Sequence, residues 1–113
     1  MTWHEAKDAC EHLDRHLMEV KTEKQRQLAV KFVQHSGSEW MWLGGSDEKE
    51  EGKWVWASDN SDIDLVEFWK IGESTVDVDS NNDFLVIHAN SEGVGDFYDV
   101  GPTNKYPFVC TRN

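Results

Sequence analysis

The sequence predicts an α+β fold, because its first third and the remainder follow different periodicities. Two stretches in the first third repeat apolar residues at helical spacing, and each is preceded by a helix-capping signal. The rest of the chain holds short segments rich in aromatic and β-branched residues, bounded by Gly, Asn, Asp and Pro, as strands are. Helices followed by strands are typical of α+β domains.

The first predicted helix starts at a capping signal. Thr2 is followed three residues later by Glu5, and this spacing forms a capping box, in which each side chain accepts a hydrogen bond from the other residue's backbone N–H. Apolar residues then recur at helical spacing, at Trp3, Ala6, Cys10, Leu13 and Leu17. They would give this helix one apolar face.

The second predicted helix starts at a similar signal, Thr22 with Gln25 three residues later. Its expected apolar face consists of Leu28, Ala29, Phe32 and Val33. Gly37 then supplies a stop, because glycine readily adopts the left-handed conformation that ends many helices.

Four segments have the composition of strands: "EWMWLGG" (39–45), "KWVWA" (53–57), "DFLVIHA" (83–89) and "YPFVCT" (106–111). Tryptophans stand two apart in the first two segments, Trp40 with Trp42 and Trp54 with Trp56. Residues two apart on a strand share a face, so we expect each pair to point to one side, most simply into the core.

Residues 58–83 fit neither pattern. This stretch carries eight acids against one base, a net charge of −7 within the total of −11. A loop of this length inside a compact domain is usually functional or disordered. Phe68 and Trp69 in its middle indicate a loop that is anchored to the core.

Size and charge narrow the classes of function. The chain has 113 residues, the size of one domain. Acids outnumber bases by 22 to 11, which argues against nucleic acid and against an anionic membrane surface as partners. Cations, or partners with basic patches, fit better. No apolar run has the length of a membrane span, so we expect no membrane insertion.

The sequence carries no recognisable catalytic motif. The nucleophile elbow, the phosphate-binding loop and the dinucleotide-binding glycine pattern are all absent from it. Carboxylates are plentiful, but a surface loop offers them no apolar pocket that would tune them for acid–base catalysis. We therefore expect a binding module and not an enzyme.

The two cysteines, Cys10 and Cys110, stand near opposite ends of the chain. They lack the spacing of a zinc knuckle or of a thioredoxin motif. Either they form one disulfide in a secreted protein, or they are two buried thiols in a cytosolic protein. We expect the disulfide.

At this point the sequence resembles a C-type lectin-like domain over its whole length. Three motifs carry the resemblance: "W-x-x-A-x-x-x-C" (Trp3, Ala6, Cys10), "WLGGSDEKEEGKWVW" (42–56) and the closing "FVC" (108–110). The resemblance implies one domain, 1–113, with two helices, a small antiparallel sheet and a long loop region that carries the ligand site. It also implies a disulfide between the first helix and the last strand, matching Cys10 with Cys110.

The resemblance leaves the family's opening strand apparently missing. That strand precedes the first helix and pairs with the last strand, so residues 108–111 would lack their usual partner. Residues missing before Met1, pairing with a second chain in a homo- or hetero-oligomer, and a tolerated open edge are three alternatives, of which we favour the first.

The motif that forms the family's sugar site is the part of the family pattern from which this chain differs most. Where lectins of the family carry Glu-Pro-Asn or Gln-Pro-Asp around a cis proline, this chain has Glu73, Ser74 and Thr75. A cis bond without proline costs about 2.5–4 kcal/mol, so we expect Ser74 to be trans and the flanking side chains to converge differently. The ligand positions implied by the resemblance are Glu73, Thr75, Asn82, Tyr98 and Asp99. Phe97 and Tyr98, which the resemblance places at the ligand loop, are candidates for aromatic contacts to a ligand.

The residues of an auxiliary calcium site of the family are better preserved in this chain than those of the sugar site. The auxiliary site matches Asp47, Glu51 and Asp83. Calcium takes six to eight oxygen ligands, so three carboxylates with Asn82, a carbonyl and waters can bind one ion with modest affinity. The alternative is that the same residues only shape the loop, as they do in family members without calcium.

The sequence therefore predicts a secreted, extracellular binding module that recognises a glycan through a non-standard calcium and sugar site. Two alternatives stay open. One is a protein-binding member of the family without a sugar site, and the other is a structural subunit of an extracellular assembly.

Overall fold

The computed structural model describes residues 1–50, 53–63, 83–89 and 95–112. Its elements in chain order are α1 (Trp3–Glu11), β1 (His16–Leu17), α2 (Glu23–Ser36), β2 (Trp40–Ser46), β3 (Val55–Trp56), β4 (Phe84–Ala89), β5 (Gly95–Val100) and β6 (Cys110–Thr111). Helices and antiparallel strands lie in one domain, which confirms the predicted α+β class.

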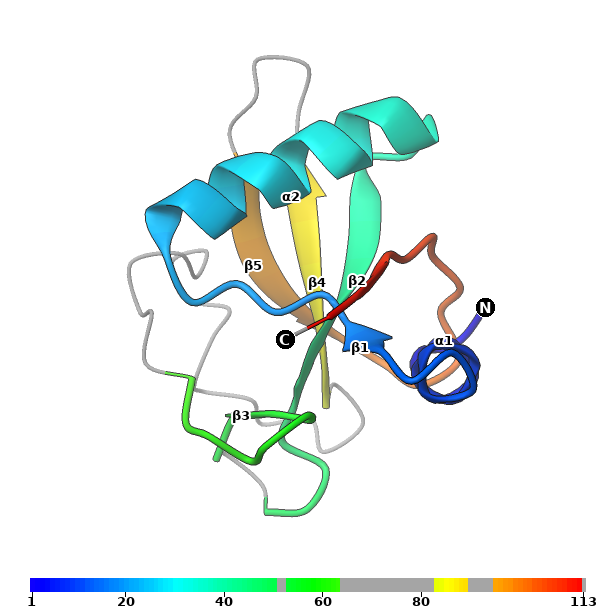
Figure 1. Cartoon of the computed structure of the whole chain (residues 1–113), viewed down its shortest axis with the longest axis vertical. Helices are drawn as coiled ribbons and strands as arrows, with labels where there is room; N and C mark the ends of the chain where they lie inside the picture. Colours follow the sequence, from blue (N-terminus) through cyan, green and yellow to red (C-terminus); the bar gives the residue numbers. More distant parts are fainter. Residues whose placement is uncertain (51–52, 64–82, 90–94, 113) are drawn as a thin grey trace.

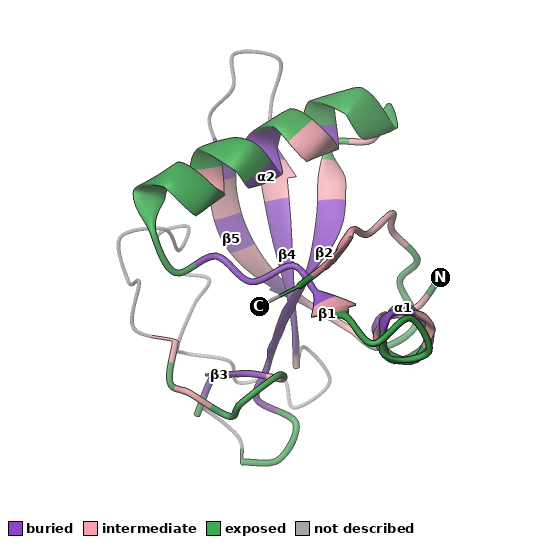
Figure 2. Ribbon diagram, in the orientation of Figure 1, coloured by how far each residue is buried: buried purple, intermediate pink, exposed green. Residues whose placement is uncertain are grey.

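The strands form two antiparallel sheets. One has four strands in the order β3-β2-β4-β5, and the other pairs β1 with β6. α2 crosses one face of the larger sheet, over β5, β4 and β2, whereas α1 lies beside β1 (Figure 1). Beneath α2 the strands are a mixture of buried and intermediate residues, whereas the outer side of α2 is exposed (Figure 2).

α1 begins as predicted and ends earlier than predicted. The Thr2 hydroxyl accepts from the Glu5 N–H at 3.3 Å and the Glu5 carboxylate accepts from the Thr2 N–H at 2.9 Å, which confirms the capping box. Leu13 is exposed and Leu17 belongs to β1. The reason is a turn at Asp14, whose φ of 56° is left-handed, so the chain leaves the helix and Leu17 pairs with Cys110.

α2 has the predicted caps, but its apolar face is shifted from the predicted one. Thr22 accepts from the Gln25 N–H at 3.1 Å, and Gly37 ends the helix with φ 78°. The Gln25 side chain accepts from the N–H of Lys21, one residue before the cap. Leu28 is exposed and Val30 is buried, so the predicted inclusion of Leu28 in the apolar face was wrong. The buried residues are Ala29, Val30 and Val33, with Phe32 partly buried beside them.

The predicted strand segments are confirmed, with shorter bounds at β3 and β6. β1 and β5 were not predicted, since β1 is only two residues long and β5 covers "GDFYDV", which we assigned to the ligand loop. β6 pairs with β1, so the last strand has a partner of its own within the described chain. Whether a further strand precedes the first helix stays a prediction.

Two hydrophobic clusters lie on opposite faces of the larger sheet. The cluster beneath α2 includes Val33, Ile87 and Phe97 together with Trp54 and Trp56. The cluster against α1 includes Trp3, Trp42, Phe84 and Val86, with Trp40 at its edge. Each tryptophan pair therefore points to one face, as its spacing predicted.

The predicted disulfide is present. Cys10, in the last turn of α1, is bonded to Cys110 of β6 with an S–S distance of 2.09 Å. The bond ties the first helix to the last strand across a sequence separation of 100 residues.

Candidate functional site

Three acids lie at one end of the larger sheet, where β2 and β5 finish and β4 begins (Figure 1). Asp47 follows β2 and Asp83 precedes β4, and the Asp47 N–H donates to the Asp83 carbonyl at 3.0 Å. Asp99 of β5 pairs with Leu85, two residues along from Asp83. Paired residues, and residues two apart on a strand, share a face. Asp47, Asp83 and Asp99 are therefore on the same side of the sheet.

Two of these acids are buried. Asp47 is 1% exposed and Asp99 is 9% exposed, whereas Asp83 is half-buried. Burying a carboxylate is unfavourable unless hydrogen-bond donors or a cation stabilise it. Carboxylate oxygens are also the ligands that calcium prefers. The chemistry of Asp47 and Asp83 thus fits the predicted cation site.

The described residues supply only part of that site. Among them no three His, Cys, Asp or Glu side chains form a group that can hold a metal ion. Glu51, Glu73, Thr75 and Asn82, which the sequence assigned to calcium or to the ligand, lie outside the described residues. Calcium binding at Asp47, Glu51 and Asp83 therefore stays a prediction.

The two described ligand positions on β5 face opposite ways. Tyr98 and Asp99 are consecutive on a strand, so Asp99 faces the α2 side and Tyr98 the α1 side. Phe97 is 0% exposed in the cluster beneath α2, so the expected aromatic contact between Phe97 and a ligand was wrong. The structure does not bring Tyr98 next to Asp99, and a ligand contact at Tyr98 stays a prediction.

Tyr98 belongs instead to a group of rings that the sequence did not single out. Its ring centroid lies 5.2 Å from that of Trp40 and 5.8 Å from that of His88, and Trp40 lies 6.0 Å from Tyr106. Burial raises the pKa of the Tyr106 phenol. These contacts join β2, β4, β5 and the segment before β6, which indicates a packing role. The sequence signal that could have indicated this ring group is the alternation of aromatic residues along β2.

The family assignment follows from the whole chain. The family profile described as the lectin C-type domain matches residues 1–112. The chain belongs to the C-type lectin family. Members of this family are generally non-enzymatic binding modules. No helix in the described ranges is long and apolar enough to cross a membrane.

Several animal proteins are similar to the chain in sequence. The chain is 31% identical to the hepatic lectin of Gallus gallus over 112 residues, covering 99% of this chain and 50% of the relative. It is 29% identical to the CD209 antigen-like protein C of Mus musculus over 113 residues, covering 98% and 58%. The chain thus spans about half the length of these curated relatives.

Solved structures share the fold. The mouse scavenger receptor C-type lectin carbohydrate-recognition domain superposes with a TM-score of 0.77 at 25% identity, over 99% of this chain and 82% of that chain. The cow CD23 carbohydrate-recognition domain, solved in the presence of a GlcNAc2Man3 oligosaccharide, gives 0.78 at 23% identity, over 97% and 78%. A calcium-independent type II antifreeze protein gives 0.76 at 23%, over 97% and 77%.

Proposed function

We propose that this C-type lectin domain is a secreted glycan-binding module whose ligand surface lies at the sheet end that carries Asp47, Asp83 and Asp99. The observation that supports this most is the burial of the Asp47 carboxylate beside Asp83, on the side of the sheet that also carries Asp99. A buried carboxylate placed next to other acids is a suitable ligand for a cation.

Calcium is the cation that this donor set fits. Asp47 and Asp83, with Glu51, would hold it, and the bound ion would supply positive charge that offsets the repulsion among the neighbouring acids. The hydroxyl groups of a sugar would then bind Glu73, Thr75, Asn82 and Asp99. Because Ser74 replaces the family's proline, these side-chain oxygens would contribute hydrogen bonds more than direct calcium contacts. Tyr98, on the opposite face, is not part of this proposal.

An extracellular location has independent support. Disulfides such as Cys10–Cys110 form and persist in oxidising compartments. Expression of the chain behind a secretion signal should give oxidised protein in the medium. Predominantly reduced thiols in the secreted protein would count against this location.

A glycan array with and without EDTA tests the binding. We expect a glycan signal that Asp99→Asn reduces by about tenfold or more, because a hydrogen bond to a charged group contributes about 1.5–3 kcal/mol. Asp96→Asn is the matched control, since Asp96 lies on the same strand and faces the other side. The absence of any glycan signal in either condition would defeat the proposal and favour a protein ligand.

Thermal unfolding tests the cation. Calcium at millimolar concentration should raise the Tm by mass action, because it binds the folded state better than the unfolded chain. Asp47→Asn should remove most of that rise. An equal rise in wild type and Asp47→Asn would place the ion elsewhere.

A further inference from the structure

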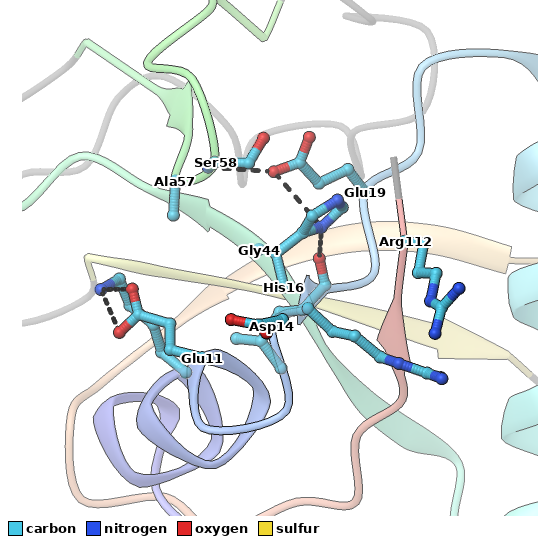
Figure 3. A pocket seen from close by; sticks show the side chains of 11 residues that line it. Glu11, Asp14, His16, Glu19, Gly44, Ala57, Ser58 and Arg112 are labelled. Carbon is cyan, nitrogen blue, oxygen red and sulfur yellow. Dashed lines mark hydrogen bonds and ion pairs between the residues drawn. The ribbon is translucent and has the colours of Figure 1, made fainter.

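A pocket of about 440 Å³ lies away from the acidic end of the sheet, between α1, β1, β2 and the segment that follows β3 (Figure 3). Gly44 of β2, Leu17 of β1, Ala57 and Ser58 are among its lining residues. Asp47, Asp83 and Asp99 are not among its lining residues. The pocket is therefore a separate site.

Two arginines at the pocket stand opposite one another. β1 and β6 pair His16 with Thr111 and Leu17 with Cys110. Arg15 comes directly before β1 and Arg112 directly after β6, so continuing this register by one residue brings Arg15 opposite Arg112. Both residues are exposed and both line the pocket. Like charges directly opposite one another across a strand pair are destabilising. In a chain with 22 acids and a net charge of −11, neither guanidinium forms an ion pair with a described residue.

Two of the three acids in the pocket lining are paired with lysines. Glu11 is paired with Lys7 at 3.1 Å. Glu19, whose side chain is 7% exposed, accepts from the Ser58 N–H at 3.2 Å and lies 3.5 Å from the Lys21 ammonium. Asp14 is the remaining acid in the lining, against the two arginines. Lys21 is shared with Asp59, which also lies 3.5 Å from its ammonium, so the positive charge at the pocket is local to Arg15 and Arg112.

We propose that this pocket binds a hydroxylated oxyanion, such as an acidic sugar residue carrying a carboxylate or a sulfate. The guanidinium groups of Arg15 and Arg112 would bind the oxyanion from two strands, because the planar fork of arginine matches such groups. The Glu19 carboxylate and Ser58, which also line the pocket, offer acceptors and a donor to the ligand hydroxyls. An anion would also relieve the repulsion between the two arginines. The proposal does not depend on glycan binding at the acidic end of the sheet.

NMR titration of the isotope-labelled chain with glucuronate and with glucose 6-sulfate tests this proposal. Each titration is run at constant ionic strength and in EDTA, so that a calcium-dependent site makes no contribution. We expect saturable shifts at Arg15, Arg112 and Ser58. Arg112→Gln and Arg15→Gln should each lower the affinity by about tenfold or more. Lys31→Gln, which removes an exposed charge from α2, should leave the affinity unchanged.

Two further ligands make the outcome decisive. Neutral glucose should bind at least tenfold more weakly than glucuronate, and inorganic sulfate should bind more weakly than glucose 6-sulfate. Equal affinity for glucose and glucuronate, equal affinity for sulfate and the sulfated sugar, or arginine variants that bind as well as wild type would each overturn the proposal. Arg112→Lys, which keeps the charge and loses the planar fork, should fold normally and bind with intermediate affinity.

Discussion

The two faces of the four-stranded sheet are stabilised in different ways, although the same strands supply both. On the α2 face the packing leaves no room for an extra carbon at Gly95 or at Gly45. A Cβ at Gly95 would lie 2.6 Å from a methyl group of Val30, and a Cβ at Gly45 would lie 2.7 Å from a methyl group of Ile63. On the α1 face, individual covalent and hydrogen bonds join segments that are distant in the sequence. The Cys10–Cys110 disulfide is one, and the indole N–H of Trp3, which donates to the Leu43 carbonyl at 2.9 Å, is another.

This difference indicates how each helix is held. α2 is 14 residues long and is held mainly by the shape of its buried face, with one hydrogen bond from the Arg26 guanidinium to the Gly95 carbonyl at 2.8 Å. α1 has only 9 residues and a smaller contact with the sheet. Short helices depend on tertiary interactions for their stability, and for α1 a covalent bond and a buried hydrogen bond provide them. Variants can therefore perturb one face selectively.

Loss of the disulfide should have the largest effect. Cys10→Ala together with Cys110→Ala should lower the free energy of unfolding by about 2–5 kcal/mol, as measured by urea denaturation. Hydrogen exchange should show protection lost first in α1, β1 and β6, and retained in α2 and β4. Reduced wild type serves as the control and should match the variant. Uniform loss of protection across both faces would show that the disulfide does not stabilise the α1 face selectively.

Overfilling the α2 face should have the next largest effect. Gly95→Ala places a methyl group against Val30, and an overpacked core loses about 1–3 kcal/mol. Combining it with Val30→Ala should cost less than the sum of the two single changes, because the smaller side chain makes room. Thermal unfolding of the four proteins measures this coupling. Strict additivity would mean that the two residues do not compete for space.

Removing one hydrogen bond on the α1 face should cost less than removing the disulfide. Trp3→Phe keeps most of the ring and leaves the buried Leu43 carbonyl without its donor, at a cost of about 1–3 kcal/mol. Trp42→Phe is the matched variant, since its indole N–H donates to the Met1 carbonyl in a less buried position. We expect the smaller loss for Trp42→Phe in chemical denaturation. The reverse order would show that burial does not set the strength of these bonds.

The capping box of α1 should give the smallest effect. Thr2→Ala should cost about 1 kcal/mol, as is typical for an N-cap. Hydrogen bonds from the Thr2 backbone and side chain hold the pKa of Glu5 below its ordinary value of 4.5. A lowered pKa stabilises the fold above pH 4.5, and this contribution is lost as the pH falls through the folded-state pKa. The difference in Tm between wild type and Glu5→Gln should therefore narrow on acidification, and a constant difference from pH 7 to pH 3 would contradict the assignment.

Much of the fold could be predicted because the signals for it are local. Thr2, Thr22 and Gly37 act through their own backbone neighbours, so sequence alone locates three of the four helix ends. The fourth could not be located, since Leu13 and Leu17 continue the helical spacing and only tertiary pairing with Cys110 removes Leu17 from the helix. β5 was missed because its alternation of buried and half-buried residues includes the acids Asp96 and Asp99.

The candidate sites were less predictable for the same reason. The resemblance to a family pointed to Asp47, but its near-complete burial arises from how β2 and β4 meet. Arg15 and Arg112 are separated by nearly the whole chain and become neighbours only through the register of β1 with β6. No local pattern in the sequence carries that information.

The position of the Cys10–Cys110 bond also determines how the domain responds to mechanical tension. A force applied to the chain before Cys10 and after Cys110 passes through the covalent bond instead of through the sheets. The 100 residues between the cysteines would otherwise add about 330–360 Å of extended chain on unfolding. While the bond is intact, a force applied outside the two cysteines cannot release that length, so the segment between them transmits load almost without stretching.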